Sequence, residues 1–267
     1  MEKKIKDKLE WAKGLLTIKS KDINLDECCK KLESERKSYP GWIILPKNQR
    51  EWLFHRTSEI IPRLSTLKIS NSELGIRFIY EINWRWEKCF YPLYTNMQKV
   101  YEKVLGLDEN LKKIKIDSFD RAVQEKAIEL VLGLYRSYRE DSNKKKCEIL
   151  EVILDDIIPN MTLSQKHRYN YERILYASLL YDYKNFIERI ENWDTTDAAP
   201  IWQVKRAGLL AEIGKQQDSL LILNALLQEV RKQQGKKDII DEYYLLSIEN
   251  LTMSLISYIQ DSMYSEN

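Results

Sequence analysis

The stretch Ile201–Val230, IWQVKRAGLLAEIGKQQDSLLILNALLQEV, decides the fold of this 267-residue chain. Its apolar residues recur at helical spacing on both sides of Gly214, which predicts two packed helices joined by a tight turn. A second stretch, Tyr169–Trp193, has a similar layout, and its turn residue Tyr183 precedes Gln216 by 33 positions (216 − 183 = 33). A helix–turn–helix unit that returns at this spacing predicts an array of helical hairpins.

The first stretch follows the tetratricopeptide pattern in part. With Gly214 as the turn glycine, Ala207 and Ser219 fill the small positions, where two helix backbones approach closely. Leu210 replaces the tyrosine of the pattern, Leu223 replaces its aromatic residue, and its first tryptophan and final proline are missing. We therefore expect an all-α fold, in which antiparallel helical hairpins form a tetratricopeptide-like solenoid.

The composition favours long helices with short connections. The chain has only 8 glycines and 6 prolines, which argues against turn-dense sandwiches and barrels and against glycine-rich nucleotide folds. Its 43 basic and 41 acidic residues nearly cancel, to a net charge of +2. A balanced charged surface is typical of solvated helices and does not indicate a dedicated nucleic-acid binder.

Cysteines and histidines give no sign of a metal or cofactor site. The 4 cysteines have neither disulfide nor zinc spacing, and only 2 histidines are present. The sequence contains no apolar run long enough for a membrane helix and no signal-peptide core. We expect a cytoplasmic protein without metal, cofactor or membrane contact.

Helical periodicity changes in regularity along the chain. Residues 1–110 form an irregular N-terminal helical region, in which Leu74 and Phe78 begin an apolar ridge at four-residue spacing. Residues 111–267 form a helical-repeat region, read as one continuous array. Helices are expected there at 119–138, 145–158, 162–180, 184–193, 201–213, 218–232 and 238–259.

Three segments resemble the helical-repeat regions of bacterial anti-phage defence proteins: GWIILPKNQREWLF (41–54), WQVKRAGLLAEIGK (202–215) and EYYLLSIENLTMSL (242–255). In several of those proteins the repeats follow a sirtuin-like NAD-hydrolysing domain and sense or hold phage proteins. The present sequence has no glycine-rich strand–turn–helix unit, so the resemblance transfers no catalytic residue. It implies a non-enzymatic scaffold or sensor that binds a phage protein or a cognate effector subunit.

An all-α ribonuclease is the alternative. Arg50 and His55 form an R-x4-H string on an expected helix, similar to the motif of HEPN-type ribonucleases. In that family such residues activate the RNA 2′-hydroxyl and stabilise its phosphate, although Glu51 departs from the residue type usual after the arginine. The scaffold and ribonuclease readings therefore make opposite predictions about RNA cleavage.

Two clusters of basic and aromatic residues are candidates for contact with a partner, because tyrosine, tryptophan and arginine anchor protein interfaces. The first contains Trp84, Arg85, Tyr91 and Tyr94, and the second Lys166, Arg168, Tyr169 and Arg173. Packing within and between helices is the competing explanation for both clusters. The identity of the partner and the oligomeric state stay open.

Overall fold

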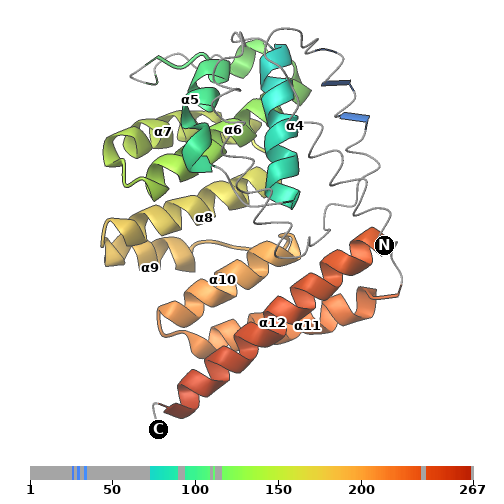
Figure 1. The fold of residues 1–267 in the computed structure, drawn as a ribbon. Helices are drawn as coiled ribbons and strands as arrows, with labels where there is room; N and C mark the ends of the chain where they lie inside the picture. Colours follow the sequence, from blue (N-terminus) through green and yellow to red (C-terminus); the bar gives the residue numbers. More distant parts are fainter. Residues whose placement is uncertain are drawn as a thin grey trace. The chain divides into compact units, whose positions relative to one another are not determined.

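A computed structural model shows a helical protein (Figure 1). It describes residues 26, 29–30, 33–34, 73–89, 94–108, 111, 116–235 and 239–265, with the backbone alone at 82, 84–89, 94–96, 117, 239–243 and 265. All regular elements in these ranges are helices, so the expected all-α class is confirmed for them. The chain divides into two compact units, Met1–Met161 and Thr162–Asn267.

Unit 1 is organised around one central helix. It contains α4 (Glu73–Cys89), α5 (Tyr94–Leu105), α6 (Arg121–Glu140) and α7 (Lys144–Ile157), with short 3-10 turns at Ile116–Ser118 and Ile158–Asn160. α6 packs against α4, α5 and α7. Seven of its apolar side chains, including Tyr135, are fully buried, because apolar residues occupy nearly every side of its middle turns.

Unit 2 consists of five helices. They are α8 (Leu163–Leu179), α9 (Tyr183–Glu191), α10 (Pro200–Glu212), α11 (Gln216–Gln233) and α12 (Ile239–Ser265). Helices α8 and α9 form one hairpin and α10 and α11 form the next, with both turns at the same edge of the unit (Figure 1). α10 contacts α9, α11 and α12, and thus joins two apolar clusters.

Local sequence explains where these helices begin. Asp120 caps α6 by accepting a 3.0 Å hydrogen bond from the Val123 amide. Thr162 and Gln165 form a capping box at the start of α8, and Pro200 occupies the first turn of α10, where its missing N–H costs nothing. These capping residues determine where each helix begins, which the apolar periodicity alone does not.

The same three-residue turn ends α6, α8 and α10. In each, two successive N–H groups reach back to helical carbonyls in the Schellman arrangement, for example Tyr181 to Ser178 at 3.0 Å and Asp182 to Ala177 at 3.1 Å. The middle residue has a left-handed backbone: φ is +56° at Ser142, +58° at Tyr181 and +81° at Gly214. Tyr183 and Gln216, paired by their spacing in the sequence, are the first residues of α9 and α11.

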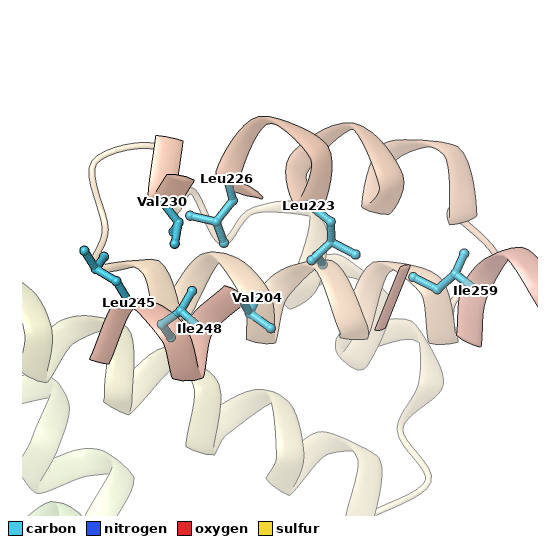
Figure 2. Close-up of a cluster of buried hydrophobic side chains, with 8 residues drawn as sticks. Val204, Leu223, Leu226, Val230, Leu245, Ile248 and Ile259 are labelled. Atoms are coloured by element: carbon cyan, nitrogen blue, oxygen red, sulfur yellow. The ribbon is translucent and has the colours of Figure 1, made fainter. Parts of the chain in front are cut away.

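The α10–α11 hairpin and α12 enclose one of the two clusters of buried apolar side chains, which we call the second cluster. Figure 2 shows Val204, Leu223 and Leu226 meeting Ile248 of α12 in this cluster. Ala207 and Ser219 are both fully buried, as expected of small residues at a close approach. The Ser219 hydroxyl donates to the Ala207 carbonyl at 2.7 Å, which joins the two helices directly.

Most expected helices of residues 111–267 lie within two or three residues of the observed ones. The exception is α12, which continues to Ser265 although the apolar pattern predicted an end near Ile259. The expected division near residue 110, between an irregular N-terminal helical region and a helical-repeat region, stays a prediction. Within the described residues no helix is long and apolar enough to cross a membrane.

Candidate functional site

Large apolar side chains point into solvent at the α8–α9 turn. Tyr181 is 77% exposed, Tyr183 64% and Ile187 40%. Tyr183 and Ile187 lie four residues apart on α9 and therefore share one face, while Ile190, one turn further along the same face, is fully buried. We call Tyr181, Tyr183 and Ile187 the tyrosine edge.

Tyr181 adopts a backbone conformation that is costly for its residue type. Its φ of +58° places it in the left-handed region, where the side chain crowds the backbone. At the equivalent position of the next hairpin Gly214 adopts the same region without that cost. Since its ring is mostly exposed, the backbone hydrogen bonds of the Schellman turn hold this conformation without packing of the ring, and a large exposed ring kept at such a costly position points to a functional role.

A hollow of about 330 Å³ lies between α9, α10 and α11. We call it the α9–α11 hollow. It begins at Glu191, two turns beyond Tyr183 on α9, and it includes the side chain of Leu221, which is 71% exposed. Its lining residues are Glu191, Arg206, Leu210, Lys215, Asp218, Leu221 and Ile222.

Charged groups surround this hollow unevenly. Lys215 and Glu191 form an ion pair across its edge, between the α10–α11 turn and the end of α9. The Nε of Arg206 is buried and has no hydrogen-bond partner. Hydrogen bonds from Thr196, with a smaller contribution from the Arg206 charge, hold the pKa of the Asp194 carboxyl below its usual range. The hollow thus combines apolar walls with a guanidinium whose hydrogen bonds are incomplete.

An aromatic cluster joins the two hairpins behind this surface. Tyr171 of α8, Trp193 of the connecting segment and Trp202 of α10 lie 6.0–6.3 Å apart between ring centroids. Trp193 Nε1 donates to His167 Nδ1 at 3.1 Å, and burial lowers the pKa of His167. The neutral ring therefore carries its proton on Nε2. Lys205 lies 4.2 Å from the Tyr171 ring centroid and covers the cluster from α10.

The second predicted cluster of partner residues lies on α8 and is divided between core and surface. Tyr169 is 1% exposed, so its ring contributes to the interior of unit 2 and is not available to a partner. Arg173 lies 5.2 Å from the centroid of that ring. Lys166 and Arg168 are half-buried.

Arg173 also contributes to a smaller hollow of about 240 Å³ between α8 and α9. Its walls are mostly polar and are formed by Asn170, Arg173, Ile174, Asn185, Glu188, Arg189, Asn192 and Trp193. Arg189 Nε donates to Asn185 at 2.8 Å, so part of this polar wall is already satisfied within α9. The sequence-based choice of Arg173 therefore leads to a polar depression between α8 and α9, the helix that also carries Tyr183 and Ile187.

The remaining predicted residues cannot be placed as side chains. Arg50, His55 and Tyr91 lie outside the described residues. Trp84 and Arg85 belong to α4 and Tyr94 begins α5, but their side chains also lie outside the described part. The ribonuclease hypothesis thus stays a prediction.

Unit 1 contains a network of half-buried charges around the fully buried Glu81. Arg77 makes two hydrogen bonds to Glu33, at 2.9 and 2.6 Å, and Lys126 contacts both Glu33 and the fully buried Glu81. The hydrogen bond from Arg77 is the main cause that lowers the pKa of Glu33 to about 2. A carboxylate held so firmly in its charged form is a poor proton acceptor at neutral pH, so the network ties helices together.

Sequence reasoning missed the tyrosine edge, Leu221 and Arg206. A signal for Tyr181 was present, since it precedes Gly214 by 33 positions (214 − 181 = 33) and thus occupies the glycine position of its hairpin. No group of three potential metal ligands occurs among the described residues. Comparisons with models of known families, with curated proteins and with solved structures find no match.

Proposed function

We propose that this chain is a helical-repeat interaction protein that holds another protein through unit 2, without catalysis of its own. A tetratricopeptide-like solenoid arrangement of its hairpins is part of this proposal. The supporting observation is Tyr181, which combines a mostly exposed ring with a backbone conformation that glycine would adopt at lower cost.

The neighbours of Tyr181 strengthen the argument. Tyrosine provides a large, rigid contact surface with a polar end, and it is enriched at the energetic centres of interfaces. Tyr183 and Ile187 extend this surface along α9, and Leu221 is a further exposed apolar side chain on α11. Exposed apolar side chains that cluster in this way mark interaction sites more often than isolated ones do.

The biological setting of the proposal comes from the sequence resemblance alone. On that basis the partner is a phage protein or a cognate effector subunit in anti-phage defence, and its binding would shift the effector between two states. Residue-specific photo-crosslinking in phage-infected bacteria tests the interaction. A photoreactive phenylalanine analogue replaces Tyr183, or replaces Val152 of α7 as a control with the same exposure of 64%.

The proposal predicts a discrete cross-linked product at position 183 that is absent at position 152 and is lost in Ile187→Ser. Identical products at both positions, or none at position 183, would contradict it. Incubation of the full chain with RNA covers the alternative: cleavage that disappears in His55→Ala would replace the scaffold reading by the ribonuclease.

A further inference from the structure

We infer that the α9–α11 hollow receives an acidic side chain of the protein partner, together with an aliphatic side chain of the same segment. This inference rests on the proposed function and specifies the chemistry of the partner. It follows from Arg206, from the start of α11, and from the balance of charge around the hollow.

The guanidinium of Arg206 can donate hydrogen bonds to an additional acceptor. Within the described part of the chain its side chain forms no hydrogen bond or ion pair, and its Nε is buried. Asp194 acts on it only as a more distant charge. A partly buried guanidinium with unfilled donors is unfavourable in the free protein, and a carboxylate is the acceptor that fits its planar donor geometry.

The first turn of α11 adds positive potential on the same side. In the equivalent turns Asn143 caps α7 and Asp182 caps α9 with side-chain oxygens. Lys215 holds this position in α11 and provides no capping acceptor. No capping side chain therefore occupies the N–H groups of this first turn beside the hollow, and Asp218 in the same turn offsets part of their positive potential.

Rim carboxylates restrict which anion fits. Glu191 is already paired with Lys215, and the exposed Asp218 stands in the first turn of α11. One carboxylate at Arg206 is compatible with these negative neighbours, whereas a nucleic-acid backbone with its closely spaced phosphates is repelled. Leu210, Leu221 and Ile222 complete the walls and favour an aliphatic neighbour of the acidic residue.

A library of short random peptides, displayed on yeast and selected with the full chain, identifies the preferred segment. Selected peptides are then synthesised with either the acidic residue or its amide, and their affinities are measured by fluorescence anisotropy. The protein variants are Arg206→Gln, Leu221→Ser and the control Arg231→Gln, whose arginine is already paired with Glu249 at 2.7 Å at the other end of α11.

The inference predicts selected peptides with Asp or Glu next to Leu, Ile, Val or Met. Arg206→Gln weakens their binding about tenfold or more, and the amide peptide loses the same factor but is indifferent to Arg206→Gln. The melting temperature of the free Arg206→Gln protein does not fall, because no partner among the described residues is lost. Arg231→Gln leaves peptide affinity unchanged.

The inference is overturned if no peptide is selected, if the selected peptides lack acidic residues, or if Arg206→Gln changes affinity less than twofold. Displacement of the peptide by inorganic phosphate or oligouridylate, with the same dependence on Arg206, would instead show a general anion site. If cross-linking at position 183 still identifies a protein partner in any of these cases, only the inference fails and the proposed function stands.

Discussion

Replacing Tyr181 by glycine should stabilise the free protein and weaken its contact with a partner. The left-handed conformation costs a non-glycine residue roughly 1–2 kcal/mol. Glycine avoids this cost but loses about 0.5–1 kcal/mol through its greater freedom in the unfolded chain. Because the ring is 77% exposed, little packing is lost, and the net gain in the free energy of unfolding is about 0–1.5 kcal/mol, with a midpoint of about 0.75 kcal/mol.

Gly214→Ala is the matched opposite change. A Cβ at Gly214 has no other atom within 4 Å, so the substitution tests the backbone conformation without a steric clash. The free energy of unfolding should fall by about 0.5–1 kcal/mol, since alanine is strained at a φ of +81°. Tyr181→Ala keeps a non-glycine backbone and removes the ring, and its stability should therefore remain within about 0.5 kcal/mol of the wild type.

Urea denaturation followed by far-ultraviolet circular dichroism measures all three changes. For a chain of this size the expected rise in melting temperature of Tyr181→Gly is about 2 °C. A loss of stability in Tyr181→Gly that equals the loss in Tyr181→Ala would show that the ring stabilises the protein itself. Such a result would refute a functional role for the backbone strain at Tyr181.

Three further predictions concern the interior. Because burial lowers the pKa of His167, the unfolded chain takes up a proton more readily than the folded chain. The free energy of unfolding should therefore fall as the pH drops below the ordinary histidine pKa of about 6.5. Melting temperatures measured across this pH range should lose that dependence when His167 and Trp193 are both replaced by phenylalanine. Ser219→Ala removes the 2.7 Å bond to the Ala207 carbonyl and should cost about 0.5–1.5 kcal/mol in urea titrations, whereas unchanged stability would show that the bond is dispensable. Burial raises the pKa of the Cys147 thiol to about 12, so a thiol reagent should modify it in the native protein only at the rate of unfolding; immediate labelling would contradict its burial.

Local signals in the sequence predicted much of unit 2. Gly214 marked its turn because glycine is the residue that tolerates a left-handed backbone, and the small residues Ala207 and Ser219 marked the place where α10 and α11 approach. The end of α12 was harder to predict. Ile259 and Met263 still pack against the second cluster in a region whose other residues are polar, and tertiary contact thus extends the helix.

The candidate site could not be predicted in the same way. Tyr183 was read as a turn residue because its cap, Asp182, is equally at home in a turn or before a helix. The left-handed conformation of Tyr181 contradicts the usual preference of tyrosine, so only comparison with Gly214 hints at it. The incomplete hydrogen bonding of Arg206 depends on which described side chains surround it in space, and a sequence pattern does not show which side chains these are.

The residue that closes each Schellman turn also precedes the next helix, as Asn143, Asp182 and Lys215 do. One position thus belongs to two helices, and an inserted residue there would disturb the end of one and the start of the other together. In the connection 192–199 between the hairpins, no single residue both closes the turn of one helix and precedes the next helix. Insertions should therefore be rejected at these turns and tolerated between the hairpins only at the exposed residues Thr196 and Asp197, because Trp193, Thr195 and Ala198 of that connection are buried. The whole hairpin is thus the natural unit for recombination and for engineered extension of this protein.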